Sequence, residues 1–152
     1  MPEVLRMRVE LPGPPGEPAW PDGVALRTFE PGDARALHAL LVHAYRRGGG
    51  VVAPFAEWLP RMTGDEEFDP QLWFLAEAGG ELAGAALCWT SAFVKDLVVH
   101  ESWRRRGLGE ALLRHALAVF AARGAPAVEL KVDAGNAAAL GLYERLGLRV
   151  VE

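Results

Sequence analysis

The residues best suited to chemistry form a short basic loop, Arg104-Arg105-Arg106-Gly107-Leu108-Gly109. The loop follows an apolar run that ends near His100 and precedes a stretch with the apolar spacing of a helix. The first turn of a helix offers unpaired backbone N–H groups and the positive end of a dipole. Glycines let a phosphate approach the backbone, and arginines add forked, charged donors. The spacing therefore predicts an anion site suited to a pyrophosphate.

Other glycine-rich phosphate loops fit these residues less well. A P-loop needs Lys-Ser/Thr after its last glycine, and here Glu110-Ala111 follows Gly109. A dinucleotide fingerprint needs a third small residue where this chain has Leu112. Glu129 imitates the ribose-binding acid of that motif, but the preceding strands read as a meander and not as βαβ units. The remaining alternative is a solvated basic turn without a ligand.

A second motif, Asn136-Ala137-Ala138-Ala139-Leu140-Gly141-Leu142-Tyr143-Glu144-Arg145-Leu146-Gly147-Leu148, follows a strand predicted over residues 127–133. With it, the chain resembles the GNAT N-acetyltransferase superfamily. The family's loop pattern, Arg/Gln-x-x-Gly-x-Gly/Ala, is met by Arg104, Gly107 and Gly109. Its later pattern, Asn-x-x-Ala-x-x-Leu-Tyr-x-x-x-Gly-Phe, is met by Asn136, Ala139, Leu142, Tyr143 and Gly147, with Leu148 in place of Phe. The resemblance covers about residues 24–151.

The resemblance implies acetyl-CoA as co-substrate and no metal. The loop amides would hold the pyrophosphate of coenzyme A, and the backbone of residues 97–99 would pair with the pantetheine arm. Asn136, the only asparagine in the chain, would contact the pantetheine, cap the following helix, or do both. The implied coenzyme-binding residues are Leu97, Val98, Val99, Arg104, Arg105, Arg106, Gly107, Leu108, Gly109, Glu110, Asn136 and Tyr143.

The implied reaction is direct attack of an amine on the thioester, which needs an acid near the sulfur and a base for the amine proton. Tyr143 is the expected acid, and its alternative role is that of a half-buried helix tyrosine. Some relatives carry a glutamate base on the strand over residues 127–133, where this chain has Lys131. Others carry an acid just before a Leu-x-Val, which Asp96 matches; it would act through a water. Glu129 and His100 are weaker candidates.

The elements that must position these residues follow from the apolar periodicity. It predicts, in chain order, a strand (24–29), helices (34–45 and 53–59, the second stopped by Pro60), strands (71–78, 81–89 and 93–100), a helix (108–122), a strand (127–133), a helix (136–146) and a strand (148–151). The expected fold is α/β (α+β), the GNAT fold: a mixed, mostly antiparallel sheet flanked by helices on both faces. The resemblance adds a V-shaped opening between the strands over 93–100 and 127–133.

The chain is expected to divide into residues 1–23, an N-terminal strand (4–11) with a proline-rich linker, and residues 24–152, the GNAT domain. A GNAT sheet normally ends with two C-terminal strands, and this sequence ends after one. Residues 4–11 are therefore predicted to supply the missing strand beside residues 148–151, within the chain or swapped from a partner. Similar segments join the halves of tandem GNAT proteins such as mycothiol synthase, which this chain loosely resembles.

The acceptor is expected to be a small-molecule amine or a protein amine. The resemblance places its pocket around residues 46–62, where Gly48-Gly49-Gly50 would be mobile. Phe55 and Trp58 would line this pocket or belong to the core. The acids over residues 65–69 would attract a cationic amine or simply be solvated.

Composition limits the remaining classes. The chain has 152 residues, 51% of them hydrophobic and 24% charged, which suits one globular domain with a cytoplasmic location. A net charge of -4 argues against nucleic acid, the partner that a third hypothesis would give the arginine run. No membrane partner is expected, and Cys88 is predicted to be buried and inert. A homodimer is compatible with the sequence. The main competing hypothesis is a non-catalytic acyl-CoA-binding or regulatory domain, because the strand glutamate is absent.

Overall fold

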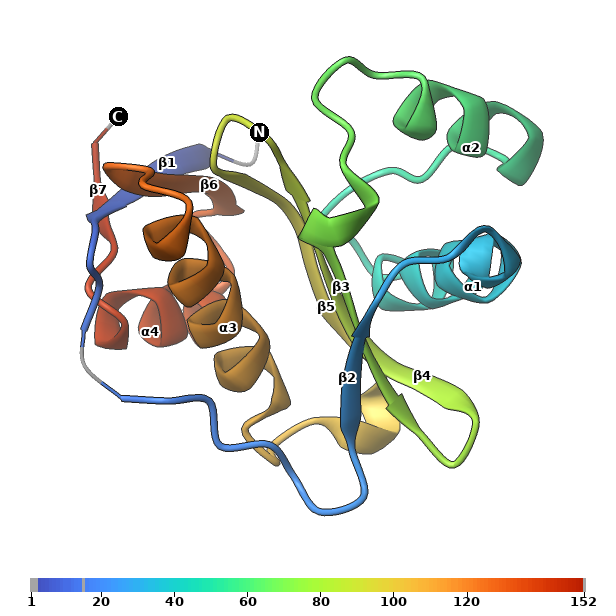
Figure 1. The fold of residues 1–152 in the computed structure, drawn as a ribbon, viewed down its shortest axis with the longest axis horizontal. Coiled ribbons are helices and arrows are strands. Elements are labelled where there is room, and N and C mark those ends of the chain that lie inside the picture. The colour runs from blue at the N-terminus through green and yellow to red at the C-terminus, as the bar shows by residue number, and fades with distance from the viewer. Residues whose placement is uncertain (1–2, 15, 152) are drawn as a thin grey trace.

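The computed structural model describes residues 3–14 and 16–151. They form one seven-stranded sheet in the order β2-β3-β4-β5-β6-β1-β7 (Figure 1). Its strands are β1 (Val4–Glu10), β2 (Ala25–Thr28), β3 (Trp73–Ala78), β4 (Glu81–Trp89), β5 (Phe93–Val99), β6 (Ala127–Asp133) and β7 (Arg149–Val150). The helices are α1 (Ala34–Ala44), α2 (Phe55–Thr63), α3 (Leu108–Ala122) and α4 (Ala137–Arg145). Only β5 and β6 pair in parallel, so the expected mixed, mostly antiparallel fold is confirmed.

The sheet separates two apolar cores, because strand side chains alternate between its faces. On one face, α1 and α2 bury Leu37, Leu41 and Trp58 against Trp73 and Leu75. On the other face, α3 and α4 pack with Phe74, Ala76 and the inward side of β6. Trp73 to Ala76 are all buried, so β3 is covered on both sides. Figure 1 shows α1 and α2 on one side of the central strands and α3 and α4 on the other.

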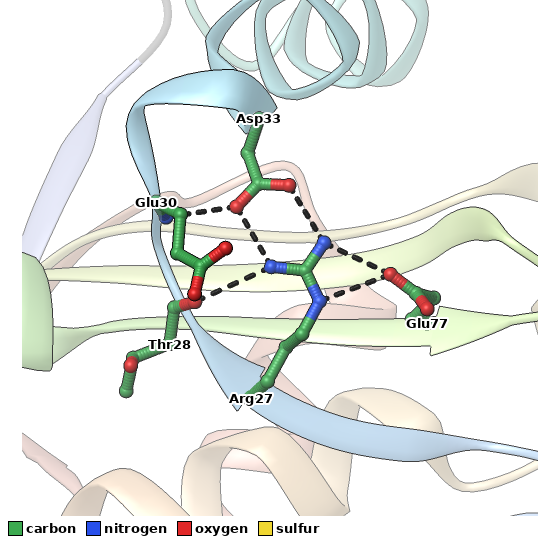
Figure 2. Close-up of polar contacts among 5 residues, drawn as sticks. All are labelled: Arg27, Thr28, Glu30, Asp33 and Glu77. Atoms are coloured by element: carbon green, nitrogen blue, oxygen red, sulfur yellow. Dashed lines mark hydrogen bonds and ion pairs between the residues drawn. The ribbon is translucent and has the colours of Figure 1, made fainter.

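An ion-pair cluster fixes β2 to its surroundings (Figure 2). The Arg27 guanidinium donates to both carboxylate oxygens of Asp33, at 2.6 and 2.7 Å, and its Nε donates to Glu77 at 3.0 Å. Asp33 also accepts from the backbone N–H of Glu30 at 2.8 Å. Arginine holds these carboxylates in a forked geometry. The cluster thus joins β2, β3 and the segment that leads into α1.

Strand β1 is an inner strand. It pairs antiparallel with β6 from Val4↔Asp133 to Glu10↔Ala127, and with β7 through Met7↔Val150 and Arg8↔Arg149. It therefore lies beside β7 within the chain, as expected, but it also separates β7 from β6, so β7 forms the edge. Met7 and Val9 are buried on the α3 face, which explains why the strand is held there.

The segment after β1 crosses the outside of α3. The Trp20 ring lies 6.1 Å from that of His115, and a Cβ on Gly13 would lie 3.4 Å from a Leu117 methyl. Four residues of the predicted terminal segments, Met1, Pro2, Pro15 and Glu152, lie outside the described residues. The division of the chain at residue 23 stays a prediction, although β1 shares its sheet and core with the rest.

Helix α2 corrects one expectation, because it continues past Pro60 to Thr63. Proline removes one backbone donor, to the carbonyl of Ala56, and normally breaks a helix. Here Trp58 and Met62 are buried on one side of the helix, and the N–H of Gly64 still bonds to the carbonyl of Pro60 at 2.9 Å. Packing on both sides of the proline therefore maintains the helix. Within the described residues, no helix is long and apolar enough to cross a membrane.

Candidate active site

Strands β5 and β6 separate soon after they meet. Their pairing covers only Phe93↔Glu129 and Val94↔Leu130. A cavity of about 1050 Å³ follows, bounded by the rest of β5, the basic loop, β6 and α4. From Lys95 on, β5 is paired with β4 alone, which leaves its other edge facing the cavity. We call this cavity the large groove.

The basic loop forms one end of the large groove. Arg105 and Gly107 have positive φ, at 62° and 81°, and α3 starts at Leu108. The first intrahelical bond runs from Ala111 N–H to the Gly107 carbonyl, at 3.0 Å. The N–H groups of the three residues between them therefore have no helical partner. With the helix dipole and nearby arginines, this end of the groove fits an anion.

Ten of the twelve predicted coenzyme-binding residues line the large groove: Leu97, Val98, Val99, Arg104, Arg105, Gly107, Leu108, Gly109, Asn136 and Tyr143. The other two point elsewhere. The Arg106 guanidinium lies over the Trp103 ring, 4.7 Å from its centroid. The Glu110 carboxylate pairs with Arg114 at 3.2 Å and with Arg145 at 3.4 Å. The backbone N–H of Glu110 remains at the start of α3.

Helix α4 brings two of these residues to the groove. The Asn136 side chain accepts from the N–H of Ala139 at 3.1 Å and so caps the helix, while Asn136 also lines the cavity. Tyr143 is 8% exposed, and burial raises the pKa of its hydroxyl to about 12. Tyr143 therefore keeps its proton at neutral pH and is a potential donor in the groove.

Asp96 is the one buried charged residue among those that the structure describes, with 6% exposure. It faces a second cavity of about 290 Å³, which we call the small cavity, beneath the α1–α2 connection. Its Oδ1 accepts from the Tyr45 hydroxyl at 2.8 Å, and the Lys95 ammonium lies 3.8 Å from its Oδ2. Burial raises the pKa of Asp96.

Asp96 and Tyr143 thus border different cavities. Tyr45 connects them, because it lines both the large groove and the small cavity. Tyr45 is not among the residues predicted from the sequence. It follows α1 directly, and its only local signal is an aromatic residue beside the glycine run, which does not point to a carboxylate 51 residues away.

The weaker candidates lie outside both cavities. Glu129 accepts from Arg6 and Arg8, at 2.7 and 2.9 Å, on the opposite side of β6 from the core. The His100 ring stacks on His43 at 4.5 Å, and its Nδ1 accepts from the N–H of Ser102. Among residues 3–14 and 16–151, no three His, Cys, Asp or Glu side chains are grouped to hold a metal.

Only some of the residues predicted for the acceptor pocket line a cavity. Trp58 is buried and lines the small cavity, together with Gly49 and Gly50. Phe55 packs edge-on against His38, at 5.5 Å. Of the acids over residues 65–69, none lines either cavity; Glu67, for example, accepts from the N–H of Ser91 at 3.0 Å.

Comparison with known proteins places this geometry in a family. The model of the acetyltransferase (GNAT) family matches residues 35–148. The chain is 34% identical over 167 residues to the mycothiol acetyltransferase of Streptomyces bingchenggensis, covering 99% of this chain and 52% of that protein. It is 39% identical over 155 residues to that of Thermobispora bispora, covering 93% and 52%. The chain therefore spans about half the length of these relatives.

Solved structures agree. A GCN5-related N-acetyltransferase from Sphaerobacter thermophilus has a TM-score of 0.84 and 35% identity, covering 98% of this chain and 48% of that one. The ribosomal-protein-S18-alanine N-acetyltransferase of Escherichia coli has a TM-score of 0.68 and 25% identity, covering 82% and 76%. These findings confirm the resemblance to GNAT proteins that the two motifs carry.

Proposed function

The chain belongs to the acetyltransferase (GNAT) family, and from that premise we propose that it transfers an acetyl group from acetyl-CoA to a primary amine by direct attack. The observation that carries the proposal is the large groove, which has unpaired N–H groups and arginines suited to an anion at one end and a protonated tyrosine in its wall. Its volume of about 1050 Å³ is at the upper end of the usual range for a small-molecule site.

The residues of the groove fit coenzyme A as a ligand. The N–H groups at the start of α3 would bind the pyrophosphate, with Arg104 and Arg105 supplying charge. The free edge of β5 over Leu97 to Val99 would bond an extended chain as an added strand. Acetyl-CoA would supply the acetyl group as a thioester.

Two side chains would move protons. Tyr143 would donate its hydroxyl proton to the departing sulfur, and its raised pKa keeps that proton available at neutral pH. Asp96 would take the proton of the attacking amine through a water, because burial makes it a stronger base than an exposed aspartate. The product amide would then leave on the side of the small cavity.

A small-molecule amine is the favoured acceptor, because the relatives that share most of this chain are named mycothiol acetyltransferases. The small cavity beside Asp96 would receive the amine. A protein N-terminus is the second candidate, and the likeness to the S18-alanine N-acetyltransferase favours it.

The proposal is tested by calorimetric titration with acetyl-CoA, followed by a free-thiol release assay over a panel of small amines and short peptides. Tyr143→Phe should lower kcat by a factor of about 100 or more and leave the Kd for coenzyme A unchanged. A folded protein that binds no acetyl-CoA would contradict the proposal. Binding without turnover on any amine would favour the non-catalytic acyl-CoA-binding alternative.

A further inference from the structure

Tyr45 occupies the junction of the two cavities. It follows the last residue of α1, and its side chain contributes to the walls of both the large groove and the small cavity. Its hydroxyl donates a hydrogen bond of 2.8 Å to Oδ1 of Asp96.

The ring of Tyr45 is held independently of its hydroxyl. A Cβ on Gly49 would lie 3.5 Å from the ring, and one on Gly50 would lie 3.7 Å from it. The backbone of this glycine pair therefore lies against the aromatic face. Removal of the hydroxyl alone should leave the ring in place, because these contacts involve only ring carbons.

The hydrogen bond gives the two carboxylate oxygens of Asp96 different surroundings. Oδ1 is occupied by Tyr45, whereas Oδ2 has the Lys95 ammonium at 3.8 Å, beyond hydrogen-bond distance. Three other ionisable groups lie in this region. Cys88 of β4 interacts with the Asp96 charge, Arg61 of α2 lines the small cavity together with Asp96, and Tyr143 of α4 interacts with Tyr45. Oδ2 is thus the oxygen with capacity for a further donor.

The donor direction of the bond is fixed. Burial, the Asp96 charge and the nearby Tyr143 all raise the pKa of Tyr45. Tyr45 is therefore protonated and can only donate to the carboxylate. This bond also lowers the pKa of Asp96, against the larger upward effect of burial.

From this arrangement we infer that Tyr45 is a positioning residue for acetyl transfer: its hydroxyl occupies Oδ1 of Asp96 and leaves Oδ2 for the acceptor amine, which reaches it through a water in the small cavity. The inference rests on the proposed function, since it assigns Asp96 to the acceptor. The ammonium form of the acceptor, held in the small cavity with one water between its nitrogen and Oδ2, would add a second cation beside Lys95.

The test compares wild type with Tyr45→Phe, using ¹³C NMR of aspartate carboxyl groups and methylammonium chloride as the probe amine. Asp96→Asn identifies the Asp96 signal. In wild type, methylammonium should shift the Asp96 signal. In Tyr45→Phe, the apparent affinity for methylammonium should fall about tenfold, because the Tyr45 hydroxyl no longer holds the Asp96 carboxylate in one orientation. The Asp96 signal should also titrate at higher pH.

Steady-state kinetics, with the amine of the acceptor panel that is acetylated fastest, gives a second readout. Tyr45→Phe should raise the KM for the amine more than it lowers kcat, and should move the acidic limb of the kcat/KM profile to higher pH. Tyr143→Phe is the matched control: it should lower kcat without moving that limb. The Kd for coenzyme A should be the same in all three proteins.

The outcomes separate the two proposals. An unchanged methylammonium response and an unchanged acidic limb in a folded Tyr45→Phe variant would overturn the role of Tyr45, even if the wild type acetylates amines. A wild type that binds coenzyme A and turns over no amine would overturn the proposed function. A shifted Asp96 titration without any change in methylammonium affinity would show a purely structural bond and would also overturn the inference.

Discussion

Replacement of Gly107 by alanine should separate the backbone role of the basic loop from its charge. Gly107 has a φ of 81° and directly precedes α3. A Cβ there would meet no atom within 4 Å, so the cost comes from conformation alone. The left-handed region costs an L-residue roughly 1–2 kcal/mol relative to glycine. For a domain of this size, each 1 kcal/mol lowers Tm by about 2–4 °C.

Coenzyme affinity should fall more than stability. If the substituted alanine relaxes toward negative φ, the N–H groups of Leu108 and Gly109 rotate away from the groove. A hydrogen bond to a charged group contributes about 1.5–3 kcal/mol. The loss of one such bond should therefore weaken coenzyme A binding by a factor of about 10 to 100. Circular dichroism melting and calorimetric titration with coenzyme A measure the two effects.

Gly124→Ala is the matched control. Gly124 follows α3 with a φ of 83°, and a Cβ there would also meet no atom within 4 Å. It lines neither cavity. The loss of Tm should therefore match that of Gly107→Ala, and the affinity for coenzyme A should not change. Equal losses of affinity in both variants, or full affinity in Gly107→Ala, would refute the assignment of the loop backbone to the coenzyme.

Three further predictions follow from other parts of the structure. Arg105→Gln should weaken coenzyme A binding about tenfold, and the loss should be greatest at low salt. Arg106→Gln should weaken binding less, because the Arg106 guanidinium lies over the Trp103 ring. Calorimetric titrations of both variants at two salt concentrations test this difference. Burial beside Phe74 lowers the pKa of His115 below its unfolded value near 6.5, so the unfolded state binds a proton that the folded state resists. The free energy of unfolding should therefore fall as pH drops from 7 to 5, and His115→Leu should make that slope shallower in urea titrations. Gly84→Ala should cost about 1–3 kcal/mol, since its Cβ would lie 2.9 Å from the Val98 carbonyl oxygen and 3.1 Å from a Leu108 methyl. Gly141→Ala, whose Cβ would meet only a flexible Arg145 nitrogen at 3.9 Å, should be neutral or stabilising in the same melts.

The elements that carry the motifs could be predicted because their signals are local. The bounds of β4 and α3 agree with the expected residues 81–89 and 108–122. β4 is an apolar run that begins after the Gly79-Gly80 turn, and α3 has a helical apolar period between Gly107 and Gly124. The cap at Asn136 has a local cause too. In contrast, the continuation of α2 past Pro60 depends on tertiary burial of Trp58 and Met62, which no window of sequence contains.

The place of β1 shows a second limit of the same kind. Its alternation puts Met7 and Val9 on one face of a strand, and in the structure both side chains are buried. Its neighbours depend on which edge of the sheet is open. One edge of β6 forms only two residue pairs with β5, and β1 pairs with the whole of its other edge. Residues 4–11 therefore lie next to β7 but are not the last strand.

The face on which Asp96 lies could not be obtained from alternation at all. In a regular strand Val94, Asp96 and Val98 share one face. The pairing shifts here, because Leu87 pairs with Asp96 while Cys88 pairs with Val94, so Lys95 is an extra residue in a β-bulge. Val94 consequently packs in the core under α3, whereas Val98 packs in the core under α1. Without the bulge, the Asp96 carboxylate would point toward the α3 core, at the high cost of an unpaired buried charge. With it, the carboxylate reaches Tyr45, so this one-residue irregularity places the proposed base at the small cavity.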